Sequence, residues 1–242
     1  MSQSAPAIVW FREDLRLSDN PALHAAVSSG RPLVLLYILD EQTKGLRPLG
    51  GASKWWLDKS LRALAADIKQ AGAQLTLRSG QSADVLDTVI EETGAETIFW
   101  NRRYDQPERD LDAAIKEDLA QRGLDVSSYN ARLLNEPWQV ETNAGGYYKV
   151  FTPYWRAARN NFVARDTYGR HKKLSGPKPE SESLDDWGLH PSSPDWSTGF
   201  DDWTPGEDGA IARLTDFLDG PINGYKEDRN RPDLDMSTSG LS

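Results

Sequence analysis

Cysteine is absent from this sequence, which excludes disulfide bonds, thiolate metal sites and thiol nucleophiles. Histidine is scarce, and His24, His171 and His190 are too scattered along the chain to suggest a metal site. The sequence has no charged-then-apolar leader and no apolar run near roughly 18 residues, the length that a membrane-spanning helix needs. We therefore expect a soluble, cytoplasmic protein with no membrane partner.

A basic surface is also missing. The net charge is −9 at pH 7, and residues 166–242 carry 16 acidic and 8 basic residues. Proteins that bind nucleic acids usually cluster lysine and arginine on one face, so charge alone argues against DNA as a partner. Tryptophan, in contrast, is abundant at nine residues, most of which can serve in the core or in packing.

Continuous apolar runs alternate with helical patterns through the first half of the chain. Apolar runs without polar alternation are typical of strands buried on both faces of a parallel sheet. We expect strands at 7–11, 32–39, 74–77, 96–100 and 124–129. The helices expected between them cover 22–28, 52–71, a segment capped by Ser82 and ended by Gly94, and 107–121. This alternation predicts an α/β fold built on a five-stranded, doubly wound parallel sheet.

Polar segments follow three of the expected strands, at 12–16, 40–42 and 101–105. The carboxyl ends of parallel strands lie at one edge of a sheet, and α/β proteins bind ligands outside that edge. A ligand site and an ordinary loop of surface ion pairs are both compatible with this pattern. No Gly-x-Gly-x-x-Gly follows the first strand, so a dinucleotide fingerprint is absent.

The chain changes character after the fifth strand. Gly145 and Gly146 predict a turn, followed by a strand and by a helix with Thr152 as its cap and Pro153 at its first position. Residues 166–205 are rich in proline, serine and aspartate and predict a linker. We expect three tryptophans to attach this linker to the domain surface, namely Trp187, Trp196 and Trp203. A last helix with an apolar side is expected from Glu207 onward.

Three motifs resemble the DNA photolyase and cryptochrome family, and most closely its bacterial class I cyclobutane pyrimidine dimer photolyases. They are Trp-Phe-Arg-x-Asp-Leu-Arg-Leu-x-Asp-Asn at 10–20, Tyr-x-Val-Phe-Thr-Pro-Tyr at 148–154, and a segment from Gly206-Glu207 to Thr-Ser-Gly-Leu-Ser at 238–242. The resemblance implies a Rossmann-like antenna domain at 1–165, an interdomain linker at 166–205 and the beginning of a helical FAD-binding domain at 206–242. It also implies that the chain is the amino-terminal part of a longer protein.

By this resemblance the whole protein is a monomeric flavoenzyme that acts on damaged DNA. Light excites reduced FAD, an electron passes to a flipped-out pyrimidine dimer, and the cyclobutane ring splits. The α/β domain holds an antenna chromophore, either a folate (methenyltetrahydrofolate) or a deazaflavin, that passes energy to the FAD. The resemblance assigns no catalytic residue and no metal to this chain, so we expect the 242 residues alone to have no repair activity.

The resemblance also assigns binding residues. The FAD pyrophosphate contacts correspond to Tyr225, Thr238, Ser239, Gly240, Leu241 and Ser242. For the antenna chromophore we expect Arg12, Asp40, Lys54, Tyr104, Asp105 and Glu108, for each of which helix capping or ion pairing is the alternative role. Glu108 stands where folate-binding members have a chromophore-binding glutamate, although Pro107 replaces the asparagine found before it in some of them. Arg156 and Arg159 either form a solvated helix face or contact DNA phosphates.

Two other functions are compatible with the sequence. A cryptochrome has the same motifs and senses light without repairing DNA. A non-enzymatic nucleotide-binding domain, such as an electron-transfer flavoprotein subunit or a stress protein, has the same kind of sheet. It would also have phosphate-binding glycines at the strand ends, and none follows the first or the fourth strand here.

Overall fold

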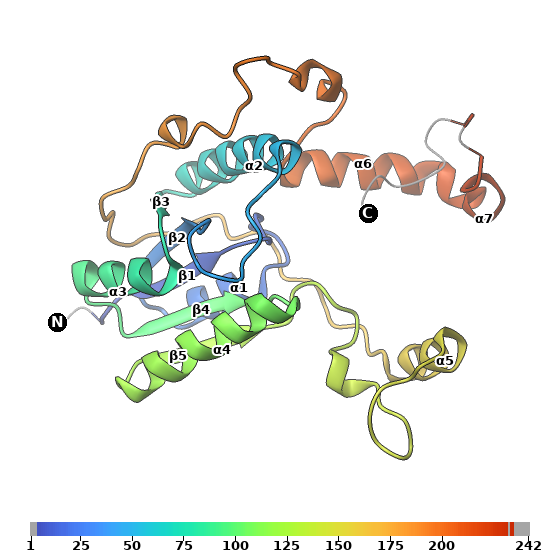
Figure 1. The fold of residues 1–242 in the computed structure, drawn as a ribbon, viewed down its shortest axis with the longest axis horizontal. Helices are drawn as coiled ribbons and strands as arrows, with labels where there is room; N and C mark the ends of the chain where they lie inside the picture. Colours follow the sequence, from blue (N-terminus) through green and yellow to red (C-terminus); the bar gives the residue numbers. More distant parts are fainter. Residues whose placement is uncertain (1–3, 232, 235–242) are drawn as a thin grey trace.

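The structure, a computed structural model, describes residues 4–231, 233 and 234. Five strands form one parallel sheet in the order β3-β2-β1-β4-β5 (Figure 1). The strands are β1 Ala7–Phe11, β2 Leu33–Leu39, β3 Leu75–Ser79, β4 Thr97–Asn101 and β5 Asp125–Tyr129. This confirms the doubly wound sheet predicted from the sequence, with every strand end within two residues of its expected place.

The central strand β1 is buried along its whole length and pairs with β2 on one side and β4 on the other. Val9 lies opposite Leu35 in one ladder and opposite Phe99 in the other. The chain order runs from β1 to β3 on one side and from β4 to β5 on the other, so it reverses between the paired strands β1 and β4. In doubly wound sheets this is the point at which a crevice opens.

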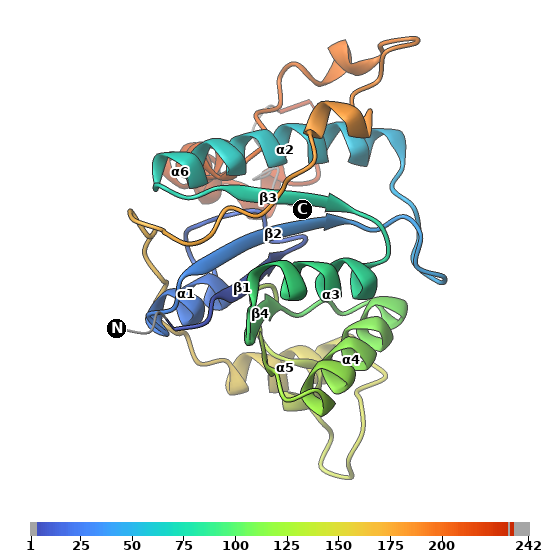
Figure 2. The same cartoon turned by 90° about the vertical axis from the view of Figure 1, so that its left-hand side faces the viewer.

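Helices cover both faces of the sheet (Figure 2). On one face α1 (Pro21–Ser28) and α2 (Gly51–Gln70) pack against the side chains of Val9 and Phe11. On the other face α3 (Ser82–Thr93) and α4 (Gln106–Gln121) pack against those of Ile8 and Trp10. Successive side chains of a strand point to opposite faces, which is why an unbroken apolar run was required for β1.

The amino terminus of α3 differs from the prediction. Ser82 is the first helical residue rather than the cap, and its backbone N–H and hydroxyl both donate to Asp40 Oδ2, at 2.9 and 2.7 Å. Thr43 also donates to Asp40, through its N–H at 2.8 Å and its hydroxyl at 2.6 Å. A carboxylate from the loop after β2 therefore caps α3, and it joins two segments that are 42 positions apart.

Residues 131–163, here termed the arm, extend away from the sheet beyond β5 (Figure 1). The arm contains a 3₁₀ turn at Pro137–Gln139 and α5 at Phe151–Asn161. The strand expected before this helix is not formed by residues 147–150, and Thr152 lies inside the first turn without a capping bond. A lone extended segment leaves its backbone groups without partners, whereas a helix satisfies its own.

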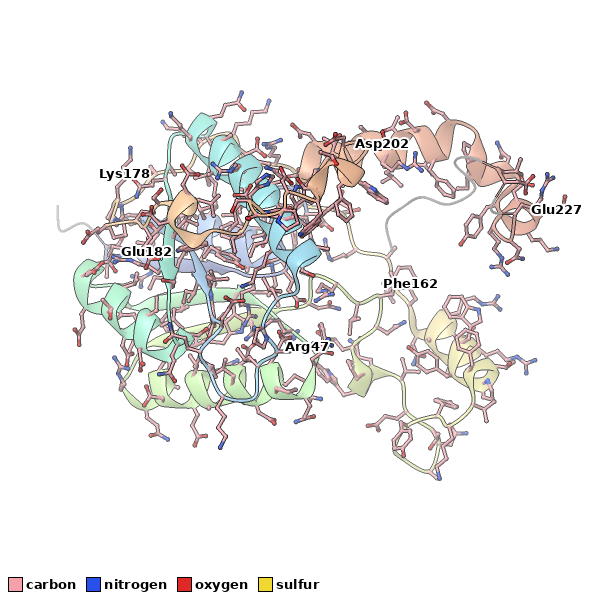
Figure 3. All side chains as sticks on the ribbon, turned by 45° about the horizontal axis from the view of Figure 1, so that its top comes forward. Arg47, Phe162, Lys178, Glu182, Asp202 and Glu227 are labelled. Carbon is pink, nitrogen blue, oxygen red and sulfur yellow. The ribbon has the colours of Figure 1, made fainter. Side chains whose placement is uncertain are left out.

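Residues 166–205, here termed the strap, lie against the α/β layers. Leu174 N–H donates to the Ala71 carbonyl at 2.8 Å and Glu182 N–H to the Leu77 carbonyl at 2.9 Å. Lys178 and Glu182 mark this segment in Figure 3. Its regular structure consists of short 3₁₀ turns at Leu184–Trp187 and Ser197–Phe200. The prediction of a segment with little regular structure is confirmed.

The three strap tryptophans do attach it to the domain. The Trp187 ring lies 6.1 Å from that of Tyr37, and the Trp203 ring lies 6.0 Å from that of Trp56. Trp196 packs on Phe200 at 5.9 Å and closely covers Gly51, the first residue of α2. The strap therefore contributes to the packing of the α/β layers rather than hanging free.

After the strap, α6 (Glu207–Asp219) runs outward from α2, and a turn at Pro221–Asn223 leads into α7 (Tyr225–Asp228), as Figure 1 shows. The predicted apolar side of α6 is largely uncovered: Ile211, Leu214 and Leu218 are 50 %, 41 % and 51 % exposed. Within the described part of the chain, no helix combines the length and apolarity that crossing a membrane requires.

Candidate functional site

A cleft of about 1100 Å³ lies outside the carboxyl ends of the central strands. Residues from the loops after β1, β2 and β4 line it, among them Arg12, Asp40 and Arg103. The three polar segments singled out in the sequence therefore do share one edge and surround one space. Its position beside β1 and β4, where the sheet order reverses, is the usual ligand position in open α/β sheets.

The deep part of the cleft combines aromatic and polar groups. Trp10 and Tyr37 are 2 % and 8 % exposed, and both line it. Burial raises the pKa of Tyr37 far above its ordinary value, so its hydroxyl stays protonated at neutral pH. Leu49 and Trp56, nearer the surface, add apolar area. A cleft that combines aromatic and aliphatic area with charged side chains suits a partly polar organic molecule.

Arg12 is fixed rigidly at the base of the cleft. Its Nη1 lies 2.7 and 2.8 Å from the two carboxylate oxygens of Asp112 on α4, and Nη2 donates to the Asn101 carbonyl. The guanidinium also lies 4.6 Å from the centre of the Trp10 ring. Burial lowers the pKa of Arg12, and the charge of Asp112 acts against that shift. Arg12 thus forms a buried ion pair and also lines the cleft.

Three buried nitrogen atoms of cleft-lining residues have no hydrogen-bond partner among the described residues: Trp10 Nε1, Arg12 Nε and Arg103 Nε. Buried polar groups are nearly always hydrogen-bonded, so each such donor needs an explanation. All three atoms are shielded beneath the wall of the cleft, so a molecule in the cleft does not reach them as the side chains lie here. Glu108, which also lines the cleft, accepts a hydrogen bond from Arg103 Nη1 at 3.3 Å, so ion pairing holds for this residue too.

The structure brings together four of the six residues expected at an antenna site, because Arg12, Asp40, Asp105 and Glu108 all line the cleft. Lys54 lies outside the described lining and pairs with Glu41, a lining residue, at 2.8 Å.

Tyr104 is likewise outside the lining, and its hydroxyl donates to Asn130 Oδ1 at 3.2 Å. Burial and the charge of Glu136 raise the pKa of Tyr104 to about 12.

One wall of the cleft was not predicted. Ala210, Ile211 and Leu214 of α6 line it, although they are far in sequence from the strand-end loops. The helix is held there by Glu207, whose carboxylate accepts the N–H of Leu17 at 2.7 Å and that of Ser18 at 3.0 Å. The sequence predicted the apolar side of α6. It gave no sign that this helix would lie against the loop after β1, because Glu207 and Leu17 are 190 positions apart.

The remaining predicted residues lie away from the cleft. Tyr225 begins α7, and its ring meets that of Phe217 edge-on at 5.7 Å. The other expected FAD contacts, Thr238, Ser239, Gly240, Leu241 and Ser242, lie outside the described residues. Arg156 and Arg159 are exposed on α5, and neither has an ion-pair or hydrogen-bond partner for its side chain in the described part of the chain.

Comparison with known proteins gives consistent similarities. The family model described as DNA photolyase matches residues 7–174. The deoxyribodipyrimidine photo-lyase of Agrobacterium fabrum is 47 % identical over 233 residues, which cover 95 % of this chain and 48 % of that protein. Cryptochrome-1 of Arabidopsis thaliana is 34 % identical over 240 residues, covering 98 % of this chain and 35 % of its own length.

A solved structure is similar over the whole chain. The bacterial class III photolyase from Agrobacterium tumefaciens matches with a TM-score of 0.94 at 46 % identity, over 100 % of this chain and 50 % of its own. The chain thus spans about half the length of the photolyases that it matches. The narrower resemblance to class I enzymes, expected from the motifs, is corrected by this match to a class III enzyme.

Proposed function

Because the chain belongs to the DNA photolyase family, we propose that it is the amino-terminal part of a deoxyribodipyrimidine photo-lyase, an enzyme that splits cyclobutane pyrimidine dimers with light. The identity of 47 % to a photo-lyase of that name supports this proposal. In the whole protein, excited reduced FAD would give an electron to the dimer. The role of the part described here is to hold an antenna chromophore.

The cleft is the proposed antenna site, and the observation that carries this is that the loops after β1, β2 and β4 bring Arg12, Asp40 and Glu108 to one space. A bound folate or deazaflavin would supply light absorption and pass its excitation energy to FAD. Arg12 and Arg103 would meet its acceptor atoms, and Asp105 and Glu108 would accept from its ring N–H groups. Trp56 would cover its apolar surface.

The division into parts follows the same proposal. Residues 1–165 form the antenna domain, 166–205 the interdomain linker and 206–242 the beginning of the FAD-binding domain. Tyr225, Thr238, Ser239, Gly240, Leu241 and Ser242 would contact the FAD. Arg156 and Arg159 would contact phosphates of damaged DNA, since both are exposed cations on the arm.

A binding titration tests the antenna site. The 242-residue chain is titrated with methenyltetrahydrofolate and, separately, with a 5-deazaflavin, and binding is followed by absorbance and fluorescence anisotropy. We expect one of the two to bind, and Glu108→Gln to weaken its binding about 10-fold by removing a charged acceptor, worth about 1.4 kcal/mol. Glu117→Gln, on the exposed side of the same helix, is the control. Binding of neither compound would contradict the antenna assignment.

An illumination assay tests whether dimer repair needs the part of the protein that follows these 242 residues. The 242-residue chain, supplied with FAD and irradiated with near-ultraviolet light, is expected to leave a dimer-containing oligonucleotide unrepaired. The full-length protein is expected to repair it under the same light. Repair by the chain alone would overturn the proposal that the flavin chemistry belongs to the rest of the protein.

A blue-light receptor of the cryptochrome type is the second candidate. The identity of 34 % to Cryptochrome-1 over nearly the whole chain supports this second function. The same assay separates the two functions, because a cryptochrome would bind flavin and respond to light while leaving the dimer intact.

A further inference from the structure

We propose that Glu207 is a positioning residue that fastens α6 over the cleft, so that occupation of the cleft and the placement of α6 and α7 depend on each other. This rests on the proposed function, in which the cleft binds an antenna chromophore and Tyr225 of α7 contacts FAD. The two chromophore sites would then be joined by one helix and one carboxylate.

The side chain of Glu207 joins α6 to the turn after β1. Its side chain is buried, with 9 % of the residue exposed, and it accepts two backbone N–H groups from the turn between β1 and α1. One of them belongs to Leu17, which is 1 % exposed in the core. Hydrogen bonds to a carboxylate are stronger than those between neutral groups, so these two bonds hold the first turn of α6 against the turn after β1.

The first turn of α6 carries the other attachments as well. A side chain at Gly206 would place a Cβ 2.8 Å from Ala63 Cβ of α2, and its φ of +109° also favours glycine. Arg170 of the strap lies 3.3 Å from Asp208 and 2.5 Å from Asp67 of α2. Beyond this turn α6 is largely exposed, and Figure 3 places Glu227 at the far end of the extension that it begins. These contacts fix the first turn of α6 against the α/β layers.

A molecule in the cleft would contact both sides of this attachment. Leu15 and Arg16 of the turn after β1 line the cleft, and so do Ile211 and Leu214 of α6. A ligand that contacts both pairs of residues binds the attached arrangement better than a detached one. By thermodynamic linkage it stabilises that arrangement, and the attachment raises the affinity for the ligand by the same factor.

This coupling reaches beyond the cleft because α6 continues into α7. The chain passes from Asp219 through the turn Pro221–Asn223 directly to Tyr225. A change in the direction of α6 is thus a change in the position of Tyr225. We infer that antenna occupancy helps to set the position of the proposed FAD contact, in addition to supplying energy.

Hydrogen–deuterium exchange of the 242-residue chain tests the role of Glu207. Amides of residues 211–219 on α6 are compared with those of β1 and β2, in the free protein and with methenyltetrahydrofolate or a 5-deazaflavin as probe. Glu207→Gln keeps the size of the side chain and replaces one acceptor oxygen with an amino group. Glu227→Gln, an exposed substitution on α7, is the matched control.

In Glu207→Gln we expect exchange on α6 to be about 10-fold faster, with β1 and β2 unchanged, and probe affinity to fall by a similar factor. In the wild-type protein the probe should slow exchange on α6, and Glu227→Gln should behave like the wild type. Unchanged exchange on α6 in Glu207→Gln would overturn the proposal. So would equally faster exchange in β1 and β2, which would indicate a general loss of stability.

Failure of the proposed function gives a different result. If the wild-type chain binds neither probe, the antenna assignment is contradicted. The free-protein comparison of Glu207→Gln with Glu227→Gln still decides whether Glu207 holds α6 in place.

Discussion

Arg12, on the loop after β1, and Asp112, on α4, form a buried ion pair in which Nη1 lies 2.7 Å from one carboxylate oxygen and 2.8 Å from the other. Their side chains are 5 % and 11 % exposed. Arg103 donates to the same carboxylate at 2.8 Å. Asp112 thus pairs with two cations at the base of the cleft, Arg103 has a second partner in Glu108 at 3.3 Å, and α4 holds the loops after β1 and β4 together.

Removing this anion should be costly. Asp112→Asn leaves two buried guanidinium groups undercompensated, and we expect the free energy of unfolding to fall by about 3 kcal/mol. Urea denaturation followed by circular dichroism measures the change. Asp110→Asn, on the exposed side of the same helix, should change stability by less than about 0.5 kcal/mol. If the two variants are equally stable, the pair does not hold the cleft together.

The carboxylate of Asp40 should contribute stability through the amino terminus of α3. Asp40→Ala removes the acceptor of the Ser82 N–H and hydroxyl, and a loss of about 1 to 2 kcal/mol is expected. Asp87→Ala, which removes only an exposed pair with Arg122, serves as the control in the same denaturation experiment.

Acid should weaken the same contact. Burial acts to raise the pKa of Asp40, but hydrogen bonds from Thr43 and Ser82 outweigh it and hold the pKa below the ordinary value of 3.8. The contribution of Asp40 to the free energy of unfolding is therefore complete at pH values above 3.8, and it is lost as the pH falls through the lowered pKa. The stability difference between wild type and Asp40→Ala should shrink in that range. A difference that stays constant down to the lowered pKa would be evidence against this role.

The attachment of α6 should also depend on pH. Burial acts to raise the pKa of Glu207, yet hydrogen bonds from Ser18 and Leu17 outweigh it and, with the charge of Arg170, hold it below 4.5. Arg170 is itself shared with Asp67 and Asp208, the other charged groups at this place. The attachment is thus complete at neutral pH and is lost as the pH falls below 4.5 through the lowered pKa.

Because the chain has no cysteine, two spin labels can be introduced without background. Labels at Asp216→Cys on α6 and Lys116→Cys on α4 allow the distance between them to be measured by double electron–electron resonance. The distance distribution should be narrow at pH 7 and broaden in acid. With Glu207→Gln added it should be broad at both pH values, and a narrow one would argue against the attachment.

The arm should contribute electrostatic contacts to DNA if the proposed partner is correct. Arg156→Gln with Arg159→Gln removes two exposed cations, and the slope of log affinity against log salt concentration should fall by about 1.8. Fluorescence anisotropy with a dimer-containing duplex measures it, in the full-length protein. The matched pair Arg109→Gln with Lys116→Gln, on α4, should leave the slope unchanged, and equal slopes in both pairs would place the DNA elsewhere.

The sheet could be predicted from the sequence because its signal is local. Each central strand is an apolar run bounded by polar loops, and glycines such as Gly94 mark where helices end. The shared edge of the three polar loops follows from the parallel topology alone. For the same reason, the sequence alone could place at one sheet edge four of the six residues that we expected at an antenna site, and these four line the cleft.

The remaining features depend on partners that are distant in sequence. The cap of α3 comes from Asp40 rather than from Ser82, and the α6 wall is positioned by Glu207. Thr152 and Pro153 satisfy the local rules for a helix start, but α5 begins earlier, at Phe151, and its cap position is Val150, whose side chain cannot cap. Local preference is a weak guide where tertiary contacts decide.

The strap has a consequence for how the protein can be shortened. It occupies the outer side of β3, where Ser181 Oγ accepts the Leu77 N–H at 2.9 Å and the Glu182 carboxylate accepts the Ser79 N–H at 2.9 Å. A version that ends at residue 165 would keep every strand but leave these groups open on an edge strand. Such an edge is a template for aggregation, so that version should form soluble oligomers or precipitate, whereas one that ends at residue 205 should stay monodisperse in size-exclusion chromatography.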